Sequence, residues 1–282
     1  MIDLHTHSTA SDGTEPPADV VAAAARARLD VVALTDHDTY AGWPAAVAAA
    51  HEVGVDLVRG VEISCSHRGV SVHLLGYLVD PHAPALLAEL EHARDSRETR
   101  IERMVERMAD DGIPVSVDQV RSLAGEGATL GRPHIADVLV ANGYVGNRDE
   151  AFRDILRGGS RYYVPHYAPD PIHAVELVRQ AGGVPVMAHP FANARGWTVE
   201  DAVIEDMAEA GLAGLEAYHR DHRPAERAHA EALASRLGLF VTGSSDYHGT
   251  GKENRLGENT TTAAVLAQIE SQASSGTEVV RP

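Results

Sequence analysis

Continuous apolar runs alternate with alanine-rich or amphipathic segments along most of the chain. Residues 30–35, Asp-Val-Val-Ala-Leu-Thr, are apolar between their ends, a pattern typical of a strand buried on both faces. Similar runs predict further strands at residues 2–4, 55–64, 70–78, 184–188, 212–217 and 239–243. Helical segments are predicted at residues 18–29, 43–53, 171–181, 199–210 and 224–237, and residues 261–280 offer one more helix and a short strand. This alternation predicts an α/β architecture with largely parallel strands.

The β/α rhythm is interrupted in the middle of the chain. A long charged helix is predicted at residues 84–110, and three shorter helices follow at residues 117–124, 133–142 and 148–157. Glycines separate these helices, and no strand pattern interrupts them. We therefore expect a core formed by residues 1–94 and 166–282, with residues 95–165 as a helical insertion that caps the substrate.

Composition narrows the class of protein. The chain has 282 residues, and its 44% hydrophobic content is ordinary for a globular protein. No apolar run is long enough to span a membrane, no leader peptide is visible, and the lone cysteine, Cys65, favours a reducing, cytoplasmic setting. The net charge of −17 argues against binding long duplex nucleic acid. A small anionic substrate remains compatible, because bound metal ions would reverse the local charge.

The first thirteen residues contain the first candidate ligands. His5 and His7 follow the first predicted strand, and alternate side chains of an extended chain point the same way. They can offer two imidazole nitrogens to one cation, and Asp12 can curl back as an oxygen ligand because Gly13 permits a tight turn. A pair of surface histidines near a terminus is the alternative reading.

Imidazole and carboxylate groups recur at the carboxyl ends of the predicted strands. These are His5, His7, His37, Glu62, His189, Asp246 and His248, with His73 on the strand that follows the turn at Gly69. Parallel α/β barrels build their sites at that edge. A mixed nitrogen and oxygen set without cysteine suits Zn, Mn or Fe.

Five ordered motifs resemble those of the PHP (polymerase and histidinol phosphatase) domain family. They are Asp3-Leu4-His5-Thr6-His7, Leu34-Thr35-Asp36-His37-Asp38, Gly60-Val61-Glu62-Ile63-Ser64, Ala188-His189-Pro190 and Ser245-Asp246-Tyr247-His248. The resemblance covers essentially the whole chain and implies a distorted seven-stranded β/α, TIM-like barrel with two or three bound metal ions (Mn, Zn, Fe or Mg). It is nearest to stand-alone nucleotide phosphatases and short-RNA exonucleases that carry a helical insertion.

The resemblance also implies a ligand set. His5, His7, Glu62 and Asp246 would hold the first metal. Glu62 would bridge to a second metal that also takes His73 and His189. A third would be held by Asp12, His37 and His248, although many family members have histidine in place of this aspartate, which leaves that site's occupancy open. Asp36 and Asp38 would orient histidines through their free ring nitrogens.

Two or three cations in such a site can clamp a phosphate ester and lower the pKa of a bridging water. The expected catalytic group is therefore a metal-bound hydroxide, held by His5, His7, Glu62 and Asp246, that attacks phosphorus. Arg132 and His134 are candidates for binding the substrate, because Gly131-Arg132-Pro133-His134 resembles a motif of the insertion. The same segment also has the features of a helix N-terminus. His219 and His222 follow a strand and could protonate a leaving group, or could form a solvated face.

We expect a metal-dependent phosphomonoesterase that acts on a small nucleotide, such as AMP or a nucleoside 3′,5′-bisphosphate. A 5′-3′ exonuclease acting on short RNA is the first alternative, since cleavage of diesters and monoesters can use the same site. Histidinol phosphatase and a non-catalytic, metal-stabilised scaffold are the others. The expected partner is a small phosphorylated molecule, with no membrane, no long duplex nucleic acid and no evident protein partner.

Overall fold

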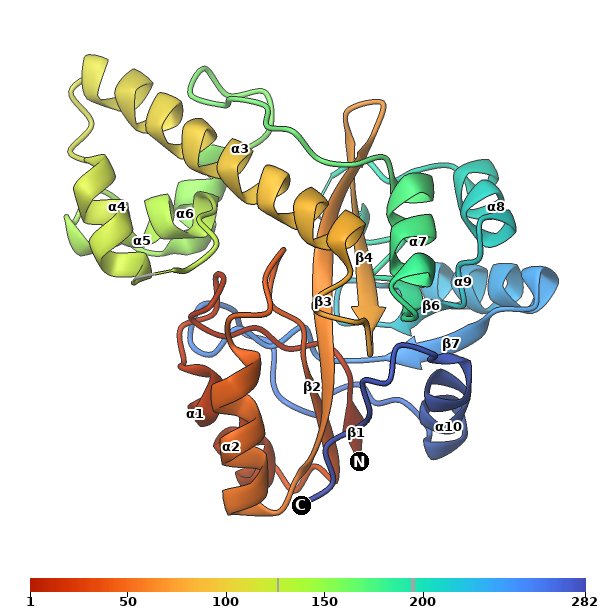
Figure 1. Ribbon diagram of the computed structural model, residues 1–282. Coiled ribbons are helices and arrows are strands. Elements are labelled where there is room, and N and C mark those ends of the chain that lie inside the picture. The colour runs from red at the N-terminus through yellow and green to blue at the C-terminus, as the bar shows by residue number, and fades with distance from the viewer. Residues whose placement is uncertain (126, 194–195) are drawn as a thin grey trace.

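The computed structural model describes residues 1–125, 127–193 and 196–282. Its strands form one sheet in which the spatial order follows the chain order (Figure 1). The strands are β1 (Ile2–Asp3), β2 (Val31–Leu34), β3 (Asp56–His67), β4 (Val70–Tyr77), β5 (Val184–Met187), β6 (Gly214–Tyr218) and β7 (Phe240–Gly243). Each of them overlaps a strand predicted from the sequence.

The reversed strand β4 lies in the middle of the sheet. Strands β1 to β3 are parallel, β4 is antiparallel to both β3 and β5, and β5 to β7 are again parallel. The two ends of the sheet approach each other, because Thr6 pairs with Tyr247 and the His7 N–H donates to the Tyr247 carbonyl at 2.8 Å. The sheet is therefore nearly closed, which confirms the expected distorted seven-stranded barrel.

Helices follow most of the strands. Those of the barrel are α1 (Pro17–Arg26), α2 (Trp43–Val53), α7 (Pro171–Gln180), α8 (Asp201–Glu209), α9 (Pro224–Leu237) and α10 (Ala263–Gln272). The short final strand expected from the sequence is reduced to an isolated bridge between Val280 and Leu57. Within the described residues, no helix combines the length and the apolar composition needed to cross a membrane.

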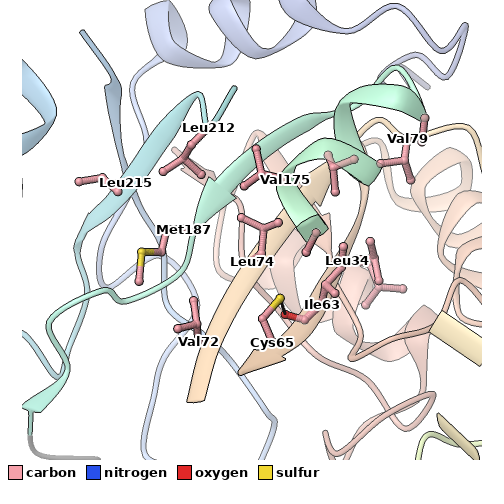
Figure 2. Packing of buried hydrophobic residues seen from close by; sticks show 14 of the residues in the cluster. Leu34, Ile63, Cys65, Val72, Leu74, Val79, Val175, Met187, Leu212 and Leu215 are labelled. Carbon is pink, nitrogen blue, oxygen red and sulfur yellow. Dashed lines mark hydrogen bonds between the residues drawn. The ribbon is translucent and has the colours of Figure 1, made fainter. Parts of the chain in front are cut away.

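Both faces of the sheet are buried, which explains the unbroken apolar runs in the sequence. On β4, Leu74 belongs to a cluster with Ile63 and Val175, whereas the next residue, Leu75, belongs to a second cluster. Figure 2 shows the first cluster packed between the strands and α7. Because this core fixes β3, β4 and β5 side by side, the polar groups at their edge have a rigid support.

The insertion has a hydrophobic core of its own. It contains most of α3 (Pro84–Asp110), then α4 (Val117–Ala124), α5 (Arg132–Ala141), α6 (Arg148–Ala151) and a π-helical turn at Phe152–Leu156, η1. Figure 1 shows α4 to α6 gathered under the far end of α3. Leu90 of α3 packs in the barrel and Ile101 in the core of the insertion. The proposed boundary at residues 94 and 95 thus falls within one continuous helix, and the division into these two parts stays a prediction.

Candidate metal centre

The ends of several strands bring the predicted ligands together. His5 and His7 follow β1, His37 follows β2, His189 follows β5, and Asp246 and His248 follow β7. Backbone pairing carries this arrangement past the strand ends, since Thr6 pairs with Tyr247 and His37 pairs with Glu62. Groups more than 200 residues apart in the chain therefore meet at one edge of the sheet.

Glu62 differs from the expected position at a strand end. It lies inside β3, which continues to His67 because its hairpin with β4 extends beyond the edge of the sheet. Its side chain is 1% exposed. A carboxylate in the middle of the assembly can face two groups of ligands at once, one with each oxygen.

The two oxygens of Glu62 do face different histidines. Oε2 lies 3.1 Å from His5 Nε2, 2.9 Å from His7 Nε2 and 3.4 Å from His37 Nδ1. Oε1 lies 2.8 Å from His73 Nδ1 and 3.3 Å from His189 Nε2. This arrangement is the one expected of a carboxylate that bridges two cations.

Among the residues that the structure describes, three overlapping groups could each hold a metal ion. Their ligand atoms lie within 4.8 Å of one another in each group, and most of the side chains are buried. The groups are His5, His7, Glu62 and Asp246; His7, Asp12, His37 and His248; and His37, Glu62 and His73. The first is the set implied for the first metal, the second adds His7 to the set implied for the third, and the last contains His37 in place of His189.

Several buried polar atoms of this centre indicate that cations fit it. The Nε2 atoms of His5 and His7 are 3.0 Å apart and both face Glu62. Asp12 Oδ1 and His248 Nε2 are 3.2 Å apart, yet neither atom makes a hydrogen bond within the described part of the chain. Buried polar atoms are normally satisfied. Converging nitrogen and oxygen lone pairs are satisfied when a divalent ion lies among them.

Electrostatics keep the carboxylates charged. Burial alone would raise the pKa of Glu62, but its interactions with the adjacent rings of His5, His37 and His73 lower it well below its usual value. Burial likewise opposes ionisation of Asp12, and its interactions with His248, His37 and His7 lower its pKa well below the normal range. Ionised carboxylates at buried positions require positive charge nearby.

The histidines divide into two electrostatic classes. Burial lowers the pKa of His248 to about 4 and that of His37 well below its usual value, so both rings are neutral near pH 7. Burial also acts against a charged His7, but hydrogen bonds to Asp246 and Glu62 outweigh it and raise the pKa of His7 to about 9. Neutral imidazoles bind metals directly, whereas a protonated one must release its proton first.

Glu216 is a buried acid of the candidate centre that the sequence did not reveal. It is fully buried on β6. Its Oε1 lies 3.1 Å from His5 Nδ1, and its Oε2 accepts a hydrogen bond from the His189 backbone N–H at 2.9 Å. One carboxylate therefore orients a candidate ligand on each of two other strands. The signal in the sequence was a lone charge inside an apolar strand, Gly-Leu-Glu-Ala-Tyr.

Asp36 and Asp38 were expected to contact histidine nitrogens, but the structure gives them other partners. Asp36 accepts hydrogen bonds from the Ser8 backbone N–H and from the Ser11 hydroxyl, each at 2.7 Å. Asp38 accepts from the Ser64 N–H at 2.8 Å and pairs with Arg97 Nε at 2.9 Å. Through these hydrogen bonds the two carboxylates fix the loops that carry the candidate ligands.

Backbone strain also gathers at this edge. Asp38, His189 and Asp246 all have positive φ, at 54°, 31° and 55°, in the left-handed region that residues other than glycine avoid. Such conformations persist where the surrounding structure enforces them, and they cluster at functional sites.

A cavity of about 200 Å³ opens beside the centre. His73, His189 and Arg132 line it, together with Trp197, whose side chain is 90% exposed. Arg132 donates to the Leu156 carbonyl at 2.9 Å and lies over the ring of Phe152. A guanidinium of the insertion thus lines the same cavity as two candidate metal ligands. From the sequence, Arg132 was only a candidate for binding the substrate phosphate.

The three other candidates for binding the substrate are buried. His222 Nδ1–H donates to the Ala217 carbonyl at 2.8 Å and its Nε2 accepts the Phe191 backbone N–H at 3.1 Å, so both ring nitrogens have partners within the protein and a substrate contact of His222 stays a prediction. His219 is fully buried rather than solvated, with Nε2 3.5 Å from Asp246 Oδ2. It therefore contacts a candidate metal ligand.

His134 has a structural role at the start of α5. Its Nδ1 accepts the Gly131 N–H at 3.0 Å, and the ring also contacts the Ser11 backbone. Burial lowers the pKa of His134, so the ring is neutral near pH 7. These contacts link α5 to the loop of Asp12, and a role of His134 in binding the substrate stays a prediction.

Comparison with known proteins shows one consistent family. The family model of the PHP domain matches residues 3–96. The chain is 36% identical to the 3′,5′-nucleoside bisphosphate phosphatase of Chromobacterium violaceum, over 90% of this chain and 89% of that protein. It is 35% identical to the 5′-3′ exoribonuclease of Haemophilus influenzae, over 87% of this chain and 89% of that protein.

A solved structure extends the likeness to the whole fold. The chain superposes with a TM-score of 0.94 on a crystal structure described as that of a metal-dependent phosphoesterase from Bifidobacterium adolescentis. The two sequences are 40% identical, and the match covers 97% of this chain and 96% of the other. The insertion is therefore included in the similarity.

Proposed function

The chain belongs to the PHP domain family of metal-dependent phosphoesterases, and from this premise we propose that it is a phosphomonoesterase acting on a small nucleotide. The observation that carries the proposal is the position of Glu62, whose two oxygens face separate sets of histidines. A phosphoryl group bound by ions on both sides of this carboxylate would have its charge neutralised at several oxygens.

Nine residues would hold the metal ions. His5, His7, Glu62 and Asp246 would hold one ion, and Glu62 would share a second with His73 and His189. The remaining ligands, Asp12, His37 and His248, would hold a third with His7 beside them. Ions in these places would supply positive charge to the phosphate. They would also lower the pKa of a bound water toward neutrality. Manganese, zinc, iron and magnesium all accept such ligands, and the ligand set does not choose among them.

The other residues position the substrate and the ligands. Arg132, at the wall of the cavity, would bind a phosphate of the substrate through its planar pair of donors. Lys252 Nζ lies 3.0 Å from Asp246 Oδ2, and His219 Nε2 lies 3.5 Å from the same oxygen. Both side chains therefore hold Asp246 in place. These contacts leave Asp246 Oδ1 directed at His5 and His7.

Trp197 supports a nucleotide as the substrate. Its ring lines the same cavity as Arg132 and is almost fully exposed. Exposed aromatic rings beside a phosphate site are suited to stacking on a base, which tolerates any base because each has a flat face. Trp43, by contrast, is buried, and its indole N–H donates to the Gly60 carbonyl at 2.9 Å.

A substrate screen tests this function. The manganese-loaded protein is incubated with nucleoside monophosphates, nucleoside 3′,5′-bisphosphates, histidinol phosphate and sugar phosphates, and inorganic phosphate is measured. We expect phosphate release to be fastest from the nucleotides. Protein with confirmed bound metal that releases no phosphate from any ester would contradict the proposal and favour a non-catalytic scaffold.

A second candidate is 5′-3′ cleavage of short RNA. The observation that favours it is the similarity over 87% of the chain to an exoribonuclease, at an identity nearly equal to that of the bisphosphate phosphatase. A phosphorylated trinucleotide separates the two activities. A phosphomonoesterase releases inorganic phosphate and leaves the oligomer intact, whereas an exonuclease releases mononucleotides.

Arg132 provides a test of substrate binding. We expect Arg132→Ala to lower kcat/KM for the best nucleotide by roughly 10- to 100-fold, the loss typical of a charged hydrogen bond. Metal content should be unchanged, because Arg132 is not among the candidate ligands. An unaffected kcat/KM would remove this role from Arg132.

A further inference from the structure

The insertion contacts the loop at residues 8–14 at more than one point. The Thr129 N–H donates to the Ala10 carbonyl at 2.9 Å. Arg148, the first residue of α6, donates from Nη1 to the carbonyl oxygen of Asp12 at 3.3 Å. The second of these contacts is made to the backbone of a candidate metal ligand. A side chain of the insertion thus reaches the metal centre without being a ligand itself.

Arg148 is held in one orientation by Asp137 of α5. Its Nε and Nη2 donate to the two carboxylate oxygens of Asp137, each at 2.6 Å. Paired bonds of this kind fix the plane of a guanidinium group. The side chain of Arg148 is 13% exposed. Burial opposes its charge, but Asp137 and, less strongly, Asp12 raise the pKa of Arg148 above its ordinary value. With two nitrogens bound to Asp137, Nη1 is directed at the barrel.

The same guanidinium packs against the loop that follows His248. An added Cβ at Gly251 would collide with Nη1 of Arg148, so the backbone approaches this side chain closely. The Thr14 N–H donates to the His248 carbonyl at 3.1 Å and joins the two loops. Arg148 therefore lies where the loops that carry Asp12 and His248 meet.

Asp12 lies between two points at which its loop is fixed. Before it, the Ser11 hydroxyl donates to Asp36 at 2.7 Å, and after it Thr14 is bound to the neighbouring loop. The contact from Arg148 falls between these points, on Asp12 itself. Because the carbonyl and the side chain of one residue share a Cα atom, a bond that fixes the carbonyl also limits where the carboxylate can lie.

We propose that Arg148 is a positioning residue for the third metal ion, because it holds Asp12 where its carboxylate can share that ion with His37 and His248. This inference rests on the ligands that the proposed function assigns to the third ion. It does not depend on which ester is hydrolysed. The third site would then be built by both parts of the molecule, with the ligands on the barrel and their support on the insertion.

Helix α5 gives this arrangement a second consequence. It begins with Arg132, which lines the substrate cavity, and carries Asp137 in its middle. The ring of His134, between them, contacts the backbone of the loop at residues 8–14. One helix thus supports the substrate cavity at its start and the third ion one turn later.

The test is a titration of manganese into chelator-treated protein, followed by calorimetry and elemental analysis. We expect wild type to bind three ions. Arg148→Met should weaken the binding of one ion by about 10- to 100-fold, the loss typical when a group that orients a ligand is removed. The other two affinities should stay within about threefold of wild type. The matched control is Arg153→Met, which changes an arginine of the insertion whose side chain is 68% exposed, and it should bind as wild type does.

Asp12→Asn identifies the ion that is lost. It changes the ligand itself, so its weakened ion should be the one weakened in Arg148→Met. Adding Arg148→Met to Asp12→Asn should then alter the remaining affinities by no more than about threefold, because Arg148 acts through Asp12. An arginine that only stabilised the fold would lower Tm in both backgrounds and would leave the affinity for this ion unchanged.

A further variant controls for the unpaired carboxylate that Arg148→Met leaves at Asp137. Arg148→Met combined with Asp137→Asn removes both charges, and it should lose affinity for the same ion while its circular dichroism spectrum matches that of wild type. Three results would each overturn the role of Arg148. They are a wild type that binds only two ions at saturating manganese, an unchanged third affinity in both variants, and an equal weakening of all ions.

Failure of the proposed function would look different. The metal-loaded wild type would then release phosphate from no ester, although it would bind three ions and Arg148→Met would still lose one of them.

Discussion

A single buried carboxylate, Glu216, fixes two candidate ligands at once. It contacts the ring of His5 with one oxygen and the backbone N–H of His189 with the other. Burial opposes its charge, but His5 and His219 lower the pKa of Glu216 to about 2, so it is ionised at any physiological pH. The permanent charge makes it a strong acceptor, which holds the opposite nitrogen of His5 toward Glu62.

We therefore expect Glu216→Gln to weaken metal binding by about 10- to 100-fold, as is typical when a group that orients a ligand is removed. The amide cannot accept at both oxygen positions, so His5 loses its fixed orientation. Manganese affinity measured by calorimetry checks this, with Glu209→Gln, an exposed acid on α8, as the control. Equal affinities in all three proteins would rule out the positioning role.

His166 predicts a specific dependence of stability on pH. Burial and the charges of Arg97, Arg100, Arg132 and His73 lower its pKa to about 3, against about 6.5 in the unfolded chain. Between these values the unfolded state binds more protons, so the free energy of unfolding rises with pH there and declines as pH falls from 6.5 toward 3.

We expect His166→Gln to show a shallower decline in stability than wild type between pH 6.5 and 4. Its slope should be smaller by up to about 1.4 kcal/mol per pH unit, the limit for one proton. Urea unfolding in the presence of chelator measures both curves. Parallel curves for the two proteins would show that His166 does not titrate in this way.

At the residue scale, the sequence predicted best those groups that follow a strand. His5, His37, His189 and Asp246 were found because polar residues end an apolar run at each of these points. Glu216 and Arg148 were missed for opposite reasons. Glu216 is one charge inside a buried strand, and Arg148 is one of many charges in the helical insertion, so neither pattern shows its partner.

At the scale of elements, the loop at residues 8–14 joins two of the ligand groups. Gly13 lies against the backbone of His7, where an added Cβ would be 2.5 Å from the His7 carbonyl oxygen. The Gly13 N–H also donates to the Ser8 carbonyl at 3.0 Å. This close approach returns Asp12 to within 3.2 Å of His248 Nε2.

We expect Gly13→Ala to displace Asp12 and to reduce the number of manganese ions bound per chain, with a fall in activity. Gly158→Ala is the matched control, because an added Cβ there meets open space. Metal stoichiometry by elemental analysis gives the result. A Gly13→Ala protein with the same stoichiometry as Gly158→Ala would show that the loop tolerates the shift.

The elements themselves were largely predictable. The bounds of α2, α3 and α9 agree with the sequence pattern, because each of these helices has a proline at its first or second position. Less predictable was the length of β3, which depends on its partner β4 rather than on its own residues. The π-helical turn at Phe152–Leu156 was also missed, since it lies within a run that has an ordinary helical pattern.

At the scale of the whole molecule, the barrel and the insertion contribute opposite charges to one region. The chain has a net charge of −17, and the centre adds buried carboxylates such as Glu62, Asp246 and Glu216. Arg97, Arg100 and Arg132 supply positive charge from the side of the insertion. Since the overall field repels anions, affinity for a nucleotide must come from these local groups and from bound metal ions.

The central claim is that a metal centre built around Glu62 hydrolyses phosphate esters. Its most direct test is to measure, on the same chelator-treated and manganese-reloaded samples, metal stoichiometry and phosphate release for wild type and Glu62→Gln. We predict that wild type binds at least two ions and regains activity on loading. Glu62→Gln should bind fewer ions and lose at least about 1,000-fold in kcat, since its carboxylate faces both sets of ligands. A Glu62→Gln protein with full stoichiometry and full activity would contradict the account.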